Sequence, residues 1–138
     1  MSVHAPKRNE NKLQALKDSE EAVAYIIQMC MNEQCFPKKH RWALANKLID
    51  VGLDLLLHIR TANKVKPKDQ NQFRYRLDQS WMAVLDIEKL WALLKLSEKT
   101  LNIPIHKLEV CSDLLYKAET IVYKWRKSDL EKYKKEYS

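Results

Sequence analysis

Glycine is almost absent from this chain: its 138 residues include one glycine and four prolines. Sheet proteins use glycine at turns and bulges, so this scarcity argues against a β-rich fold and favours helices joined by few loops. The length suits a single domain with one buried core. A composition that is 46% hydrophobic and 31% charged also argues against an intrinsically disordered chain.

Long apolar runs are missing as well. No stretch approaches the roughly 20 apolar residues that span a bilayer, and the opening MSVHAPKRNENK lacks the apolar core of a secretory signal. The three cysteines, Cys30, Cys35 and Cys111, are an odd number and form no CxxC motif. They are most simply structural thiols of a reducing compartment, which predicts a cytoplasmic protein without structural zinc.

The residue patterns of common catalytic sites are also lacking. A glycine-rich phosphate loop cannot be built with one glycine, and no histidine has a cysteine or serine placed to act as its nucleophile. Asp50, Asp54 and His58 form one helical ridge, for which a metal site is conceivable. The ridge falls on the polar side of its helix, so a solvated ridge, or one facing lysines of a neighbouring subunit, is the favoured interpretation. We expect no enzyme activity, no cofactor and no metal.

Four segments carry apolar residues at alternating steps of three and four, the spacing of one face of an α-helix. They cover about 18–35, 38–63, 71–96 and 104–126. Their inner lines are Val23, Ile26, Cys30; Ala45, Leu48, Gly52, Leu55, Ile59, Ala62; Phe73, Leu77, Ser80, Val84, Ile87, Trp91, Leu94; and Leu108, Cys111, Leu115, Ala118, Val122, Trp125. This pattern predicts an all-α fold, an antiparallel up-down-up-down four-helix bundle. Gly52 is expected to permit a close helix approach.

The boundaries of this bundle follow from helix-start signals and charge. Asp18, with Glu21 three residues later, has the spacing of a capping box and predicts the start of the first helix. We therefore expect a flexible basic arm over 1–17, the bundle over 18–127 and a charged tail over 128–138.

Two of the predicted helices carry more apolar surface than one core requires. Trp42, Leu53 and Leu57 fall on the side of the second helix away from its inner line, and Leu90 and Leu93 fall off the line of the third. Monomers rarely leave such stripes in water, so these five residues predict a homo-oligomer interface. The alternative is that the arm or the tail covers the leucines.

Positive charge is concentrated at connections and ends of the predicted helices. Lys and Arg exceed Asp and Glu to give a net charge of +7, which points to an anionic partner, although a merely soluble basic surface is an alternative. The three clusters are Lys38, Lys39, Arg41; Arg60, Lys64, Lys66, Lys68, Arg74, Arg76; and Lys124, Arg126, Lys127, continued by Lys132, Lys134, Lys135. We expect the first and third clusters to share one end of the bundle and the middle cluster to occupy the other.

Such clusters are typical of surfaces that contact phosphates. Tyr75, Tyr123, Tyr133 and Tyr137 lie among the charges, where they either stack on bases or pack as ordinary rim residues, the latter being favoured for any single one.

One stretch has a specific likeness. FPKKHRWALANKLIDVGLDLLLHIRTANKV, residues 36–65, places Phe36-Pro37, two lysines and Arg41 before a leucine-rich helix that ends in Ala62-Asn63. This pattern resembles the accessory variability determinant (Avd) family of diversity-generating retroelements, and the likeness extends over about 18–127. The chain departs from the family at Val122 and Tyr123, where members can carry a glycine pair.

The resemblance implies a specific role. It implies a pentameric ring of four-helix bundles that is not an enzyme but binds a reverse transcriptase and its template RNA, and possibly cDNA. The complex makes adenine-mutagenised cDNA that diversifies a target gene. The alternative is a protein–protein scaffold of the ribosomal-RNA-insert type with no nucleic-acid role, or a bundle that docks only onto an acidic protein.

Overall fold

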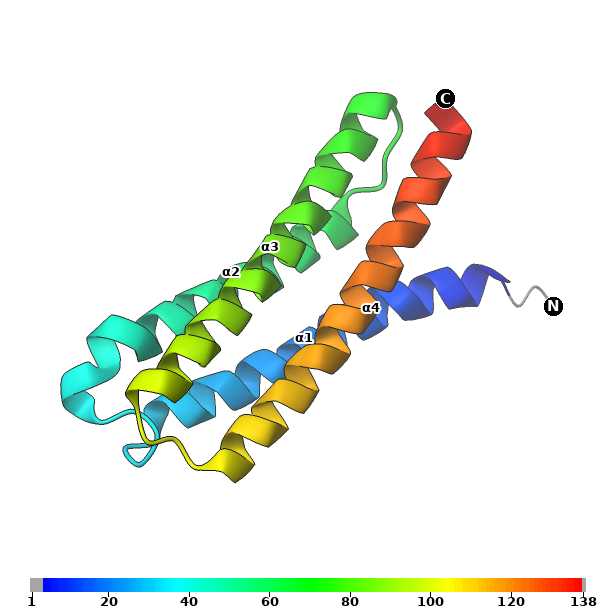
Figure 1. Ribbon diagram of the computed structural model, residues 1–138. Coiled ribbons are helices and arrows are strands. Elements are labelled where there is room, and N and C mark those ends of the chain that lie inside the picture. Colours follow the sequence, from blue (N-terminus) through cyan, green and yellow to red (C-terminus); the bar gives the residue numbers. More distant parts are fainter. Residues whose placement is uncertain (1–3, 138) are drawn as a thin grey trace.

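The computed structural model describes residues 4–137 of the chain, and all regular secondary structure within that range is helical. Four α-helices follow one another: α1 (His4–Met31), α2 (Asn46–Lys64), α3 (Gln70–Thr100) and α4 (Ile105–Tyr137) (Figure 1). A short 3-10 helix, η1 (Lys38–His40), and one π-helical turn, η2 (Arg41–Ala45), lead into α2. The prediction of four helices is therefore confirmed. None of these helices combines the length and apolar character needed to cross a bilayer.

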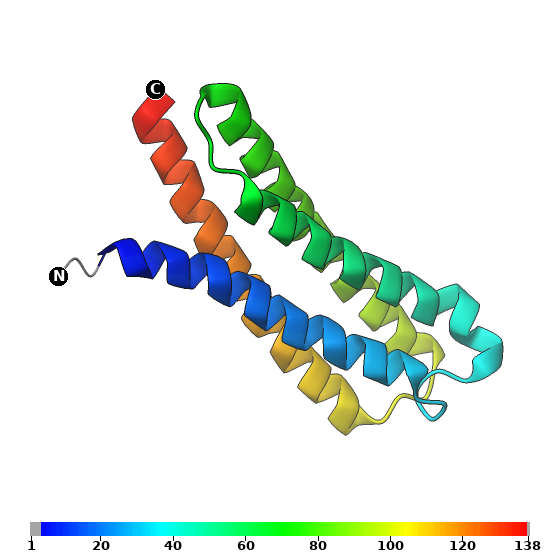
Figure 2. The ribbon, with the colours of Figure 1, turned by 180° about the vertical axis from the view of Figure 1, so that it is seen from behind.

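The helices lie side by side along most of their lengths, as both views show (Figures 1 and 2). Between α3 and α4, hydrogen bonds join Arg74 to Tyr133 at 2.9 Å and Trp91 to Glu119 at 3.1 Å. Residue numbers thus rise along α3 as they fall along α4. The end of α4 consequently lies beside the connection 65–69, while the connections 32–45 and 101–104 lie at the opposite end (Figure 1).

The core forms along the inner lines expected from the apolar spacing. All six residues of the line on α2 and its leading turn are buried, from Ala45 to Ala62. On α4 the line is buried from Cys111 to Trp125, with Leu108 half-buried. Burial of one Leu or Ile side chain is worth roughly 1.5–3 kcal/mol, so these lines account for the fold.

Gly52 lies where α2 packs against Val23 of α1. A Cβ built on Gly52 would stand 3.0 Å from Cγ1 of Val23. Glycine in a helix costs roughly 0.8–1 kcal/mol relative to alanine. The close contact with Val23 accounts for a glycine at this buried position.

The three cysteines are free thiols inside the core. Burial raises the pKa of Cys30 and of Cys111 to about 12. Since the thiolate is the reactive form, both side chains stay protonated and inert near neutral pH, as core residues do.

The expected N-terminal arm is largely helix. The prediction of a loose segment over 1–17 was wrong from residue 4 onward, because α1 begins at His4; residues 1–3 lie outside the described range. Asp18 is not a cap: it is buried within α1, accepts a hydrogen bond from Gln14 at 2.7 Å and lies 3.7 Å from the Lys117 amino group. The inner face continues back through Ser19 and Ala15, both fully buried. Asp18 and Ser19 on that face are buried but polar, so the apolar spacing alone did not reveal this part of the helix.

The expected C-terminal tail is also helix, because α4 continues to Tyr137. Asp129 and Tyr133 extend the buried face of Trp125 by two further turns, and both contact α3. Tyr133 and Tyr137 pack against Phe73 with ring centroids 5.4 and 6.2 Å apart. These contacts hold the last turns of α4 against the first turn of α3.

The five residues expected at an oligomer interface divide into two groups. Trp42, Leu53 and Leu57 are 75%, 45% and 60% exposed. Leu90 is fully buried in the protomer and Leu93 is half-buried against the core, so Leu90 was wrongly assigned to an outer surface. The physical reason is that α3 packs against both α2 and α4, which buries a wider stripe than the single line expected from its spacing.

Candidate nucleic-acid interface

The positive clusters are distributed differently from expectation. Tyr133 near the end of α4 hydrogen-bonds to Gln70 and to Arg74, both at 2.9 Å, so the middle cluster shares its end of the molecule with the end of α4. The cluster Lys38, Lys39, Arg41 lies at the other end (Figure 1). The prediction was wrong because the hydrogen bonds of Tyr133 place the end of α4 beside the start of α3 and the connection 65–69, not beside the start of α2.

We define the basic pole as the cations around the connection 65–69 and the facing ends of α1 and α4. It consists of Lys12, Lys64, Lys66, Lys68, Arg74, Lys132, Lys134 and Lys135, all exposed or half-buried. Lys12 belongs to it because Lys12 lines one pocket together with Arg76 of α3 and Lys132 of α4. Segments far apart in the sequence thus bring their cations to one pole.

A shallow groove of about 470 Å³ crosses the connection within this pole. Its walls include Lys66, Lys68, Gln72 and Tyr75. The Asp69 side chain caps α3 by accepting from the Gln72 backbone N–H at 2.9 Å, and the Gln72 side chain accepts from the Lys68 N–H at 2.7 Å. These reciprocal bonds fix the connection. Tyr75 is 50% exposed and offers an aromatic face beside two ammonium groups.

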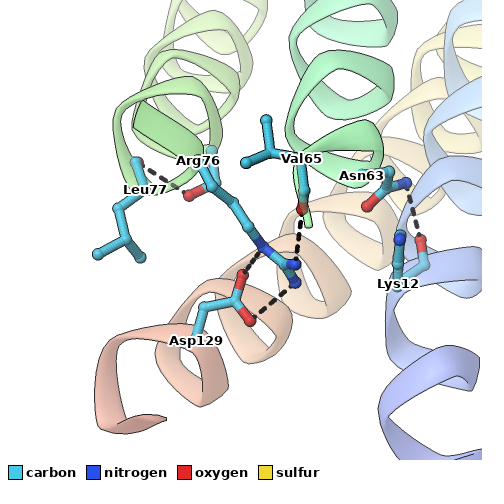
Figure 3. Close-up of polar contacts among 7 residues, drawn as sticks. Lys12, Asn63, Val65, Arg76, Leu77 and Asp129 are labelled. Carbon is cyan, nitrogen blue, oxygen red and sulfur yellow. Dashed lines mark hydrogen bonds and ion pairs between the residues drawn. The ribbon is translucent and has the colours of Figure 1, made fainter. Parts of the chain in front are cut away.

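Arg76 lies in the predicted cluster but is occupied by contacts within the protein (Figure 3). Its guanidinium donates to both oxygens of Asp129, at 2.8 and 3.0 Å, and to the Val65 carbonyl at 3.2 Å. Only 16% of its side chain is exposed. Arg76 therefore positions the connection against α4 instead of offering its charge to a ligand.

The cations of the third cluster, Lys124, Arg126 and Lys127, lie in three different surroundings. The Arg126 guanidinium carbon lies 5.1 Å from the ring centroid of Trp81, a cation–π contact to α3, and burial lowers the pKa of Arg126. Lys124 lines a separate groove with Asp18 and Tyr116. Lys127 is exposed on the outer side of α4. Of this cluster, the later lysines Lys132, Lys134 and Lys135 are the ones that reach the basic pole.

Three of the four remaining predicted cations have partners on the protein. Arg41 donates to the carbonyl of Met31, the last residue of α1, at 2.9 Å and to the carbonyl of Phe36 in the following connection at 3.3 Å. Lys38 lies 3.4 Å from Glu33, and Arg60 lies 3.5 Å from Glu20. Lys39 is exposed. The end of the molecule that carries η1 thus presents less uncompensated charge than the basic pole.

One residue of the ridge considered for metal binding, His58, contacts a buried aspartate on another helix. His58 Nδ1 lies 2.5 Å from Oδ2 of Asp86, whose side chain is almost fully buried in α3. Burial raises the pKa of Asp86, and the His58 hydrogen bond opposes that shift. No spacing signal pointed to this partner, because Asp86 lies on another helix. Within the described range, no three His, Cys, Asp or Glu residues are grouped to hold a metal ion.

The basic pole combines ammonium and guanidinium groups, side-chain amides and an aromatic face around a shallow groove. Phosphate groups pair with such cations, and exposed bases stack on such aromatic faces. Comparisons of this chain with known protein families, with curated proteins and with solved structures find no match.

Proposed function

We propose that this chain is a non-catalytic nucleic-acid-binding protein that binds single-stranded RNA through its basic pole. The observation that carries the proposal is the groove at the connection 65–69, where Lys66 and Lys68 flank the half-exposed ring of Tyr75. Lysine contacts to phosphates supply affinity without reading sequence, and one aromatic face accepts any base. The expected ligand is therefore an unpaired strand recognised with little sequence preference.

A charge-reversal variant tests this proposal. Changing Lys64, Lys66, Lys68 and Arg74 to Glu is expected to weaken RNA binding about 100-fold, or roughly 0.7 kcal/mol for each cation. The slope of log affinity against log salt should fall by about 3, since each single-strand phosphate contact contributes about 0.7. Fluorescence anisotropy with a labelled single-stranded RNA at several salt concentrations measures both quantities. Arg76 is left unchanged because it pairs with Asp129.

The matched control reverses four exposed lysines elsewhere: Lys17, Lys47, Lys95 and Lys99. Its change in net charge is identical. Equal loss in both variants would mean that overall charge, not the basic pole, attracts RNA. Full binding by the first variant, with circular dichroism showing both variants folded, would rule the pole out.

We further propose that the protein acts as a homo-oligomer of antiparallel up-down-up-down bundles. The support is the apolar set Trp42, Leu53 and Leu57, which stays exposed on α2 and η2. The reversed order of contacts between α3 and α4 supports the topology within each protomer. The number of five subunits and the ring rest on the Avd resemblance.

Polar substitutions in the apolar set test the oligomer. Leu53→Lys with Leu57→Lys is expected to reduce the mass in solution to the 16.4 kDa of one chain, because two ammonium groups cannot be buried in an apolar contact. Light scattering after size exclusion measures the mass. Leu96→Lys, at a leucine that is 48% exposed on α3, is the control and should leave the mass unchanged. A native mass of one chain would contradict the proposal directly.

The proposed place of this protein is a cytoplasmic complex with a reverse transcriptase and its template RNA. In that complex the basic pole holds RNA, or the cDNA copied from it, while the enzyme carries out the chemistry. The exposed apolar set equally suits a protein–protein scaffold with no nucleic-acid role, and the RNA-binding experiment separates the two. A neighbouring reverse-transcriptase gene with a template repeat would identify the pathway.

A further inference from the structure

An open groove of about 750 Å³ lies between α3 and α4, at the end of the molecule that carries the connection 101–104. Trp91, Leu94, Ile105 and Leu108 form its apolar part, and Ile105 is 73% exposed. A protein that stays monomeric rarely leaves such a contiguous apolar surface in water. The groove therefore favours a partner that inserts an apolar side chain.

The rim of this groove is acidic. Glu98, Glu109 and Asp113 line it, and Lys95 is the one cation among the lining residues. All three carboxylates are exposed, and none has an ion-pair or hydrogen-bond partner among the side chains that the structure describes. A partner with lysines beside an apolar side chain would match both the floor and the rim of the groove.

Beyond the groove, the surface where α3 meets α4 carries further aromatic side chains. Trp91 donates from Nε1 to a carboxylate oxygen of Glu119 at 3.1 Å, and the Tyr123 hydroxyl donates to Glu88 at 3.1 Å. Tyr123 remains 41% exposed. These bonds between the two helices fix both aromatic side chains, so the surface next to the groove is rigid and partly apolar.

The chain itself carries the matching combination of charge and apolar surface at η1 and η2. Trp42 in η2 is 75% exposed, and η1 directly before it holds the exposed residues Lys38 and Lys39. Lys39 has no carboxylate at ion-pair distance among the described side chains. Trp42 does not fill the groove of its own chain, because α2 packs against α1 and α3 while the groove lies between α3 and α4.

The exposed apolar residues of α2 and η2 lie at the same height along the bundle as the groove and the surface next to it. The contact of His58 with Asp86 sets the level of α2 against α3. Because both helices rise by about 1.5 Å per residue, Leu57 lies level with Glu88, and Trp42 lies level with the end of α3 beside the groove. The two surfaces therefore face different sides of one chain at one height.

We propose that Trp42 of one copy of this chain inserts into the groove between α3 and α4 of the next copy, with Lys39 facing the carboxylates at the rim. Leu53 and Leu57 then cover the aromatic surface beyond the groove. Since each copy gives one surface and receives the other at the same height, successive contacts need rotation without translation and can close a ring. The inference rests on the proposed homo-oligomer and identifies the surface that receives its apolar set.

Two variants each remove one of the paired surfaces. Trp42→Glu brings a carboxylate against the acidic rim, and Ile105→Lys with Glu109→Lys brings two ammonium groups into the groove. All three positions are exposed, so both variants should fold, which circular dichroism checks. Each variant alone is expected to have the 16.4 kDa mass of one chain in light scattering after size exclusion.

An equimolar mixture of the two variants tests the pairing itself. The Trp42→Glu copy keeps an intact groove and the other copy keeps Trp42, so one contact between them remains possible. The expected mass is twice the 16.4 kDa of one chain, because no third copy can join. A mixture that stays at the mass of one chain would overturn the pairing. A mixture that exceeds two chains would overturn it as well.

Tyr116→Glu is the matched control for Trp42→Glu, since Tyr116 is 65% exposed on α4 outside the groove. It should keep the native mass, and a native mass in either groove-contact variant would contradict the pairing. If Leu53→Lys with Leu57→Lys dissociates the native assembly but the mixture stays at one chain, the proposed oligomer stands and only this pairing fails. A native mass of one chain would overturn both, and the groove would then face a basic segment of another protein.

Discussion

Replacing Asp129 with alanine should lower the free energy of unfolding by about 3 kcal/mol. The change leaves the Arg76 guanidinium, only 16% exposed, without the carboxylate that accepts two of its hydrogen bonds. An unpaired charge in that position pays its desolvation cost without compensation, and removal of one partner of a buried pair typically costs roughly 3–5 kcal/mol. Urea denaturation followed by circular dichroism measures the loss.

The control is Asp113→Ala, an exposed aspartate on the same helix, for which we expect a change within about 0.5 kcal/mol. Arg76→Met and the double variant complete a double-mutant cycle. The double variant should recover part of the loss, because it leaves no charge unpaired. A native-like stability for Asp129→Ala would contradict the described ion pair.

Replacing Phe73 with alanine should also cost about 3 kcal/mol, because Phe73 is 2% exposed and the substitution leaves a cavity. It also removes the ring against which Tyr133 and Tyr137 pack. Amide hydrogen exchange should therefore accelerate most over residues 131–137, where α4 loses its partner, and less in the middle of the helix.

Tyr75→Ala is the control for Phe73→Ala, since Tyr75 is an aromatic residue of the same helix that is 50% exposed. We expect a stability change within about 0.5 kcal/mol and unaltered exchange at the end of α4. Uniform acceleration of exchange in Phe73→Ala, without a maximum near residue 131, would show that the aromatic cluster does not hold the end of α4.

The apolar spacing predicted the helices and most of their buried faces, because that spacing depends on helix geometry and not on which partner covers the face. The ends of α1 and α4 were missed for a physical reason. Their inner faces continue through Ser19 and Asp129, which are buried yet polar and break the apolar pattern. Such residues are recognisable only when their partners are known, and Arg76 lies 53 residues from Asp129.

The sequence predicted most of the residues of the candidate site, but not which contacts each of them makes. The sequence shows that Lys66, Lys68 and Arg74 are neighbours across a short connection. It does not show that Arg74 and Arg76, two residues apart, differ in role: one faces the Tyr133 hydroxyl and the other is held by Asp129. The sequence also did not indicate that Lys12 belongs to the basic pole, because the first turns of α1 were predicted to be a flexible arm.

The contact between Gly52 and Val23 makes two positions on different helices depend on each other. With only 3.0 Å between the position of a Cβ at 52 and Cγ1 of Val23, any added atom on α2 must take space from α1. Homologues that carry a bulkier residue at 52 are therefore expected to carry a smaller one at 23. The two positions should covary, and a single substitution that adds volume at either one should be poorly tolerated.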